Sequence, residues 1–385
     1  MKSFGKLLLA FLLSLSLIAC SSSDIRKETI NNVEQEKVEN KQEISQVIVK
    51  SINQIVERKA EAVKNKDFTK YMSTVNENDK EYYKEQENWF RDIMLNDIRD
   101  YSLQVMDIKS RGKDSYLVSL KQQYHYGNKD YSLNFKSIYK SNGKEYIDCD
   151  LDFNSLETEH FIIKYTEGSR NLIDKIAKDA EEGYEIVKKN YGKAPEEKTV
   201  IKIYDDEETL RQFVKLSFQW NMAGWYEYSE SIKYIGAGQV ISSRGFAHEL
   251  IHKVTIKDSN NNMPYWFAEG LAAYYSKDYY AKLVKGNEMT IKELIDSNLE
   301  QLTKDSDVLR YYGSAQCAVE FIVAEYGEDS IAEILNSLAK HPFLEGSGSE
   351  ENFKRNEVFD LTIREVLGID FERLDKEFKK SLNLK

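Results

Sequence analysis

The first half of the chain changes its hydrophobic pattern once, from helical spacing to the alternation typical of strands. Apolar residues recur every three or four positions in 47–63 and 79–94, which predicts two amphipathic helices. Stretches with strand alternation and turn residues follow at 101–105, 115–120, 131–139 and 144–153. Helices followed by an antiparallel meander indicate an α+β domain over residues 46–153. We assign this domain no chemistry.

From residue 157 the pattern alternates between strands and helices and then becomes helical throughout. The first predicted elements are a strand at 160–165, a helix at 171–192, a strand at 198–204, a helix at 206–217 and a strand at 233–243. The later ones are helices at 242–257, 263–276 and 311–327, with further helices in 329–385. The second domain, 157–385, is therefore expected to combine a small mixed sheet with a helical half, and the whole chain is expected to be α+β.

The chain begins with the pattern of an export signal. Lys2 and Lys6 precede an apolar run from Leu7 to Ala19, and its 13 residues are too few to span a bilayer. We therefore expect residues 1–19 to be a signal peptide, with an uncleaved anchor as the alternative. Residues 20–45 contain no aromatic residue and little to bury, which predicts a flexible tether.

The charge of the chain bears on its partners. The 385 residues carry 54 basic and 65 acidic side chains, a formal net charge of −11, and loss of Lys2 and Lys6 with the leader gives −11 − 2 = −13. Nucleic acid and anionic lipid repel such a chain, so we expect no nucleic-acid partner, and membrane attachment would need a lipid. Beyond Cys20 only Cys149 and Cys317 remain. They could pair in an oxidising compartment, but without the spacing of a disulfide framework we expect two buried thiols.

The candidate chemistry is concentrated in HELIH, residues 248–252. In a helix His248 and His252 stand one turn apart on one face, so both imidazoles can reach one metal ion, and two neutral imidazoles favour zinc. Glu249 leaves the helix about 100° away, where it can reach a water on the metal and act as a general base. The chain has only five histidines, so chance is a poor explanation for this spacing.

A catalytic zinc usually has three protein ligands, and Glu269 is the candidate for the third. It lies in an otherwise apolar stretch, 263–276, where an unpaired charge would be costly. Asn262 is a plausible cap of this helix, and Pro264 is a plausible first residue. An ordinary solvated carboxylate is the alternative for Glu269. Small residues would let the helix approach the metal helix: Gly270, Ala272 and Ala273.

HELIH followed by WFAEG is similar to the gluzincin metallopeptidases, the thermolysin-like and aminopeptidase N-like superfamily. The resemblance covers the second domain and implies a thermolysin-like metallopeptidase fold. It also implies one Zn²⁺ bound by His248, His252 and Glu269, with Glu249 as the base. The thermolysin branch has an Asp four residues after its Glu ligand, where this chain has Ala273, so the residues that orient the histidines remain open.

The same resemblance implies further site residues. In gluzincins the strand before the metal helix is a sheet edge that binds the substrate backbone, which by position implies Gly238, Gln239 and Val240. A buried strand without this role is the alternative. In aminopeptidase N-like enzymes a Tyr at the start of a later helix stabilises the tetrahedral intermediate. Tyr312 matches it best, and Tyr311 is one residue away.

Two more resemblances concern the first half of the chain. LIAC, residues 17–20, is followed by three serines and resembles the bacterial lipobox. This implies a diacylglyceryl group on Cys20 and a mature chain anchored in the cell membrane at its extracytoplasmic face. The order of elements in 46–153 looks like the nuclear transport factor 2-like, cystatin-like roll, although no residue motif supports this likeness.

These expectations describe a lipid-anchored zinc metallopeptidase that hydrolyses peptides or proteins outside the membrane. Aminopeptidase N-like members bind the substrate's amino terminus with the Glu of a GxMEN motif, and no such motif precedes HELIH, which favours an endopeptidase. Glu227 or Glu230 could restore an end preference, so an aminopeptidase is one alternative. A catalytically inactive binding or scaffolding lipoprotein is another. No candidate ligand or base precedes residue 157, so the second domain is expected to act without the first.

Overall fold

The computed structural model of the chain combines helices with two small sheets, which confirms the α+β class. The residues that it describes are 44–218, 223–236, 242–346 and 348–382. These residues belong to one compact unit. The expected signal peptide, Cys20 and nearly all of the tether lie outside the described residues.

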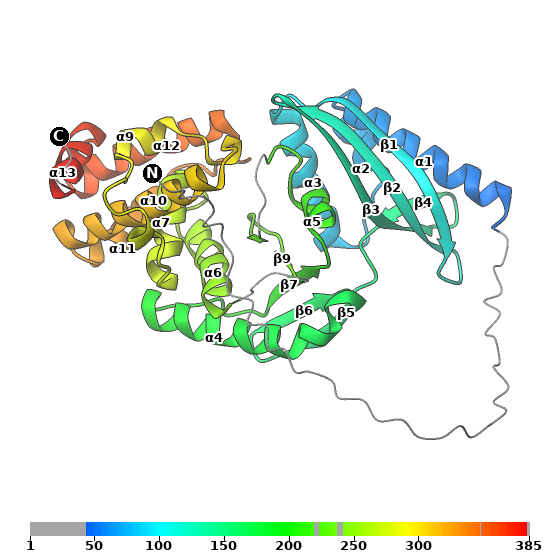
Figure 1. Cartoon of the computed structure of the whole chain (residues 1–385), viewed down its shortest axis with the longest axis horizontal. Helices are drawn as coiled ribbons and strands as arrows, with labels where there is room; N and C mark the ends of the chain where they lie inside the picture. The colour runs from blue at the N-terminus through cyan, green and yellow to red at the C-terminus, as the bar shows by residue number, and fades with distance from the viewer. Residues whose placement is uncertain (1–43, 219–222, 237–241, 347, 383–385) are drawn as a thin grey trace, which may run out of the picture. The chain divides into compact units, whose positions relative to one another are not determined.

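The N-terminal part packs three helices with an antiparallel sheet (Figure 1). Each helix begins after a side-chain cap, Ser45, Asp67 or Asp79, which accepts a hydrogen bond from a backbone N–H of the first turn. The sheet has the order β1-β2-β3-β4. Its elements are α1 (Gln46–Lys64), α2 (Phe68–Met72), α3 (Lys80–Leu95), β1 (Arg99–Ser110), β2 (Ser115–Tyr126), β3 (Lys129–Ser141) and β4 (Tyr146–Cys149).

The second sheet is mixed and has the order β5-β6-β7-β9-β8. Its strands are β5 (Asn154–Glu157), β6 (Phe161–Tyr165), β7 (Thr199–Tyr204), β8 (Gly224–Trp225) and β9 (Ile232–Ile235). The three central strands are parallel, and β5 and β8 are antiparallel to their neighbours. The connecting helices are η1 (Glu167–Leu172), α4 (Ile173–Tyr191) and α5 (Glu207–Val214). The described part of the strand before the metal helix is thus an interior strand, because β9 lies between β7 and β8.

The rest of the chain is helical. Its elements are α6 (Ser243–Asp258), α7 (Tyr265–Ser276), α8 (Tyr280–Leu283), α9 (Ile291–Asp296), η2 (Leu299–Gln301), α10 (Asp305–Tyr326), α11 (Asp329–Leu338), α12 (Ser349–Val366) and α13 (Phe371–Ser381). None of the helices that the structure describes is both long and apolar enough to cross a bilayer.

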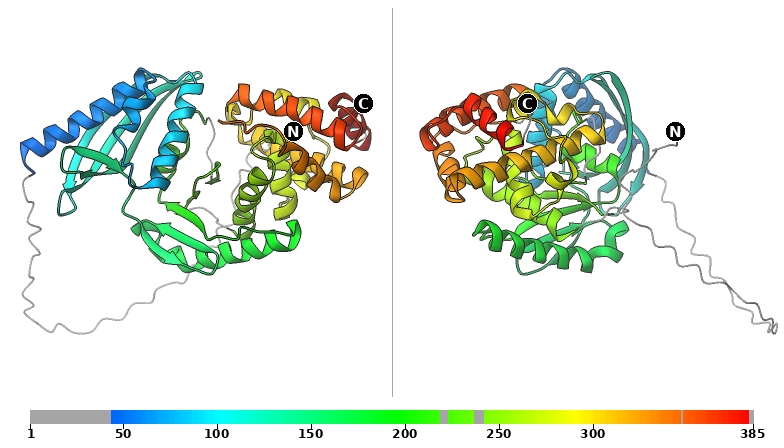
Figure 2. Two further views of the ribbon diagram at one scale, coloured as in Figure 1. Left: turned by 180° about the vertical axis from the view of Figure 1, so that it is seen from behind. Right: turned by 60° about the vertical axis from the view of Figure 1, so that its left-hand side comes forward.

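Two glycines explain how closely the helices approach one another. A Cβ on Gly183 of α4 would lie 2.8 Å from the carbonyl oxygen of Ser243 and 2.9 Å from Cβ of Phe246, so only glycine allows α4 to lie against α6. Figure 2 shows these two helices side by side from a second direction. A Cβ on Gly270 would collide with the carbonyl oxygen of Ala315. Gly270 therefore brings α7 close to α10, and the expectation that it serves the approach to α6 was wrong.

Two hydrophobic clusters fill the interior, and one of them joins the two predicted domains. The first cluster lies around α6, α7 and α10. The second contains Trp89 and Phe90 of α3 together with Leu210 and Phe213 of α5, all at most 4% exposed. Residues on both sides of the predicted domain boundary thus share one core.

Candidate metal centre

The helix that carries the two histidines forms where the sequence predicts it. Ser242 caps α6, because its hydroxyl accepts a hydrogen bond from the backbone N–H of Gly245 at 3.2 Å. His248 and His252 then lie on one face, with ring centroids 4.9 Å apart. Each residue is 8% exposed, so both imidazoles are largely withdrawn from solvent and packing holds them in place.

Glu269 of α7 meets these histidines. Its Oε2 atom lies 3.1 Å from Nε2 of His248 and 3.3 Å from Nε2 of His252. Ligand atoms from the three residues all lie within 4.8 Å of one another. With bonds of about 2.0–2.2 Å to zinc, the ligand atoms of a tetrahedral site are about 3.3 Å apart. The two imidazoles and the carboxylate therefore have both the chemistry and the spacing to bind one zinc ion.

The helix of Glu269 begins differently from the prediction. α7 starts at Tyr265, and Pro264 occupies the cap position with extended backbone. The backbone N–H of Tyr265 donates instead to the side chain of Asn352 at 3.0 Å, so a distant helix supplies the cap. Asn262 is not the cap, because its buried amide donates to the carbonyl of Leu338 at 3.1 Å.

Asp278 is a site residue that the sequence reasoning missed. Its Oδ2 lies 3.2 Å from Nδ1 of His248 and also accepts a hydrogen bond from the Ser276 hydroxyl at 2.8 Å. Lys277 ends α7 in the left-handed conformation, with φ of 62°, and this turn brings Asp278 back to the histidine. A carboxylate on the second nitrogen orients a metal-binding imidazole and raises its basicity. Asp278 is thus placed to orient the imidazole of His248.

Within this cluster, Glu269 and His248 shift one another's pKa values toward the charged forms. Burial raises the pKa of the Glu269 carboxyl, but the imidazoles of His252 and His248 outweigh burial and hold this pKa at about 2. Burial lowers the pKa of His248, but its hydrogen bonds with Asp278 and Glu269 outweigh burial and hold this pKa well above the usual value. Glu269 is therefore ionised at neutral pH, which is the form in which a carboxylate binds a metal.

Glu249 and Tyr312 face the same cavity as the cluster. The cavity is lined by His248, His252 and Glu269, by Glu249 and Tyr312, and by residues of the segment 224–228. Burial raises the pKa of the Glu249 carboxyl. The ring of Tyr312 lies 6.0 Å from that of His248, between centroids. Tyr311 does not line the cavity and is fully buried, which favours Tyr312 over its neighbour as the residue that can contact a ligand.

The opposite wall of this cavity begins at the edge of the sheet. β8, residues Gly224–Trp225, lines the cavity and is the last strand of the described sheet. The predicted backbone-binding residues Gly238, Gln239 and Val240 lie outside the described residues. Among the described strands, β8 is therefore the edge beside the metal cluster, and β9 is not.

The two carboxylates considered for an aminopeptidase lie in different surroundings. Glu227 lines the cavity, but its Oε2 lies 3.1 Å from the ammonium of Lys215, and that ammonium lies 3.1 Å from Glu300. Glu230 is buried and pairs with Lys233. Of these two carboxylates, only Glu227 is in the cavity, and it already has a cationic partner.

Comparison of the sequence with models of known protein families gives no match, and comparison with curated proteins gives none either. The residues of the site are therefore the evidence for function.

Proposed function

We propose that this chain is a zinc-dependent metallopeptidase of the gluzincin type. The observation that carries the proposal is the convergence of His248, His252 and Glu269, with ligand atoms within 4.8 Å of one another, in a cavity that Glu249 also lines. Asp278 behind His248 adds the carboxylate–histidine arrangement common at zinc sites. The catalytically inactive scaffolding lipoprotein is less favoured, because ligands, base and orienting carboxylate are all present.

The protein residues would divide the chemistry of peptide hydrolysis. A zinc ion in this site supplies a Lewis acid that polarises the peptide carbonyl and acidifies water. Glu249, withdrawn from solvent, takes the proton of the attacking water and passes it to the leaving amine. The hydroxyl of Tyr312 donates to the oxygen that becomes negative as the carbonyl is attacked, a charge absent from the bound substrate.

An extended substrate would pair with the main chain of β8, because β8 is the last strand of the described sheet and both of its residues line the cavity of His248, His252 and Glu269. Main-chain pairing accepts the middle of a peptide as readily as its end. Glu227, the one of the two considered carboxylates that lines the cavity, already pairs with Lys215 at 3.1 Å, so an α-ammonium would have to compete with this lysine. An endopeptidase is therefore favoured over an aminopeptidase.

The proposal extends to the finer fold and to localisation. We propose that residues 157–385 have the thermolysin-like architecture, which the strand–helix order ahead of α6 supports. For residues 46–153 we propose the cystatin-like, nuclear transport factor 2-like roll, supported by helices packed on a four-stranded antiparallel sheet. Lipid attachment at Cys20 and work at the extracytoplasmic face of the cell membrane remain proposals from the sequence pattern.

Metal analysis combined with a peptide-library cleavage assay tests this function. The purified wild-type protein should contain one zinc per chain and cleave library peptides. The Glu249→Gln variant should also contain one zinc per chain but should cleave the same peptides far more slowly. Zinc-loaded wild-type protein that cleaves no peptide would contradict the peptidase proposal. Cleavage by Glu249→Gln at a rate near that of the wild type would contradict the role of Glu249.

A further inference from the structure

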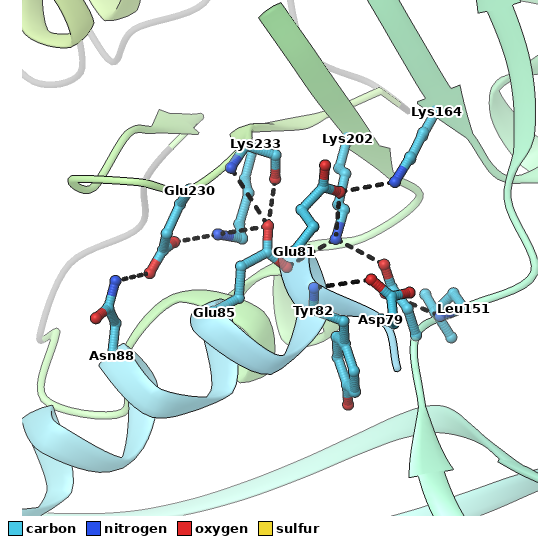
Figure 3. A network of polar contacts seen from close by, with 12 residues as sticks. Asp79, Glu81, Tyr82, Glu85, Asn88, Leu151, Lys164, Lys202, Glu230 and Lys233 are labelled. Atoms are coloured by element: carbon cyan, nitrogen blue, oxygen red, sulfur yellow. Dashed lines mark hydrogen bonds and ion pairs between the residues drawn. The ribbon is translucent and has the colours of Figure 1, made fainter. Parts of the chain in front are cut away.

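The wall of the catalytic cavity is held in place by the N-terminal part of the chain. The side-chain amide of Asn88, on α3, donates to Oε1 of Glu230 at 2.8 Å and to the carbonyl of Tyr228 at 3.3 Å. Glu230 in turn pairs with Lys233 of β9 (Figure 3). The segment that follows β8 is thus connected to α3 through its backbone and through a buried carboxylate.

A groove adjoins the cavity along this wall. Four residues line both the cavity of the candidate metal ligands and the groove: Glu227, Tyr228, Asn261 and Gly346. The opposite side of the groove belongs to α3, with Asn88, Arg91 and Leu95. A ligand bound at His248, His252 and Glu269 that extends past Tyr228 would therefore reach a groove formed jointly by the N-terminal and the C-terminal parts of the chain.

The groove has an apolar character that increases away from the metal cluster. Tyr228 is 39% exposed, and its ring lies 4.8 Å from that of Phe343, between centroids. Farther along, Leu95 lines both this groove and its continuation beside Met94, and both residues are 46% exposed. Two exposed apolar side chains at the end of a helix, in line with a catalytic cavity, offer a contact surface for another apolar side chain.

The charged residues of the groove already have partners within the chain. Arg91 of α3 lies 2.6 Å from the carboxylate of Glu345 on the other side, and both side chains are more than a third exposed. Lys84 pairs with Glu87 on its own helix at 3.2 Å. Two further acidic residues line the groove: Glu227 pairs with Lys215, and Asp92 accepts a hydrogen bond from the Ser217 hydroxyl. Each charged residue of the groove thus has a partner within the chain, and the exposed apolar side chains offer the remaining contact surface.

We propose that this groove binds the distal part of an extended polypeptide substrate and that Leu95 and Met94 form a subsite for an apolar side chain. The inference rests on the proposed peptidase function and adds a specificity-determining site to it. The occupant is a polypeptide because the groove adjoins the cavity of the scissile bond and shares four lining residues with it, and an extended chain advances about 3.3 Å per residue along such a path. The N-terminal part would thus select substrates and not only support the fold.

Peptide extension tests this subsite with the full, zinc-loaded chain. A short peptide with blocked ends that the wild-type protein cleaves is lengthened residue by residue on either side, ending in leucine or in aspartate. On one side of the scissile bond and at one particular peptide length, the peptide that ends in leucine should have a kcat/KM about tenfold higher than the peptide that ends in aspartate. This is the size of effect expected from burying an apolar side chain. Leu95→Ser should lose most of this gain while it cleaves the short peptide at the wild-type rate.

Leu361→Ser is the matched control, because Leu361 is an exposed leucine, at 59%, on α12 outside the groove. The Leu361→Ser variant should retain the higher kcat/KM for the leucine peptide. Melting temperatures near that of the wild type would show that both variants fold. Cleavage of the short peptide with no leucine preference at any length, or an equal loss in both serine variants, would overturn the subsite and leave the peptidase function intact. Failure of the wild-type chain to cleave any peptide would overturn the peptidase function itself.

Discussion

Glu269 couples the electrostatics of the candidate site to the packing of its helices. Its side chain is 13% exposed and lies in a helix that is otherwise largely apolar. A carboxylate in such surroundings is stable only with cationic partners, and the two imidazoles of α6 provide them. The same contact that neutralises Glu269 therefore brings together three ligand atoms for a metal.

The first prediction concerns metal binding at the residue scale. His252→Ala removes one of three ligands, so the bound zinc should fall from one equivalent per chain to near zero after dialysis. Elemental analysis of the purified variant measures this. His341→Ala, which changes a histidine outside the cavity, should retain its zinc. A full equivalent in His252→Ala would rule out the proposed ligand set.

The second prediction separates the base from the ligands. Glu249→Gln preserves the shape of the side chain but cannot accept a proton, so kcat should fall by about 10²–10⁴ while one zinc remains bound. Steady-state kinetics on a cleaved library peptide, with zinc analysis of the same sample, gives both quantities. Turnover near the wild-type rate would exclude Glu249 as the base.

A third prediction concerns the orienting carboxylate. Asp278→Asn keeps a hydrogen-bonding group near Nδ1 of His248 but removes the negative charge, so zinc affinity should fall about 10–100-fold without loss of the fold. Competition with a chelator of known affinity measures the change. Asp296→Asn is the control, because Asp296 makes only an exposed pair with Lys292. Equal zinc affinity in both variants would show that Asp278 has no part in metal binding.

At the scale of elements, the sequence pattern predicted the helices and strands that local interactions determine. The helices of His248 and Glu269 were predicted from sequence patterns, and the candidate ligands from the spacing of the two histidines and the apolar surroundings of Glu269. Asp278 could not be found in this way, because a left-handed Lys277 and the return of the chain toward α6 determine its position. Lys202 was equally hidden: in the strand TVIKIY it alternates with apolar residues like a solvated side chain, yet it is fully buried against α3.

The contact that buries Lys202 connects α3 to two strands of the second sheet. Glu85 of α3 accepts from the ammonium of Lys202 at 2.7 Å and lies 3.4 Å from that of Lys233 (Figure 3). Asp150 accepts from Lys202 on the other side at 2.6 Å. Burial raises the pKa of Glu85, but the two lysines outweigh burial and lower this pKa to about 2. The ionised carboxylate is therefore part of the folded state at neutral pH.

This arrangement predicts how stability depends on pH. A carboxyl with a pKa of about 2 in the folded chain and 4.5 when unfolded stabilises the fold above pH 4.5, by about 3 kcal/mol, and loses this contribution as pH falls toward 2. Glu85→Gln should therefore lower the free energy of unfolding by about 3 kcal/mol at pH 7 and by less than half as much at pH 3. Urea denaturation of both proteins at each pH measures the difference. A difference that does not change with pH would exclude an ionised Glu85 as its source.

At the scale of the whole molecule, the boundary between the predicted domains is not a boundary in the core. Leu210 and Phe213 of α5 pack with residues of α3, while Lys202 and Lys233 find their carboxylate in Glu85. Sequence patterns describe each element by its own periodicity, and long-range pairing of this kind leaves no periodic signal. These contacts argue against the expectation that residues 157–385 act without the N-terminal part.

We predict that a fragment of residues 154–385 does not fold stably. Removal of α3 would expose the apolar side chains of α5 and leave two fully buried lysines without Glu85, and Lys202 also without Asp150. Breaking a single buried ion pair in this way costs about 3–5 kcal/mol, which is a large share of the stability of a typical domain. The fragment should show no cooperative melting by circular dichroism and should bind no stoichiometric zinc. A chain that begins at residue 44 keeps every described contact and should melt like the full chain. A fragment that melts cooperatively, binds one zinc and cleaves short peptides would instead establish two separable domains and confine the role of the N-terminal part to substrate selection.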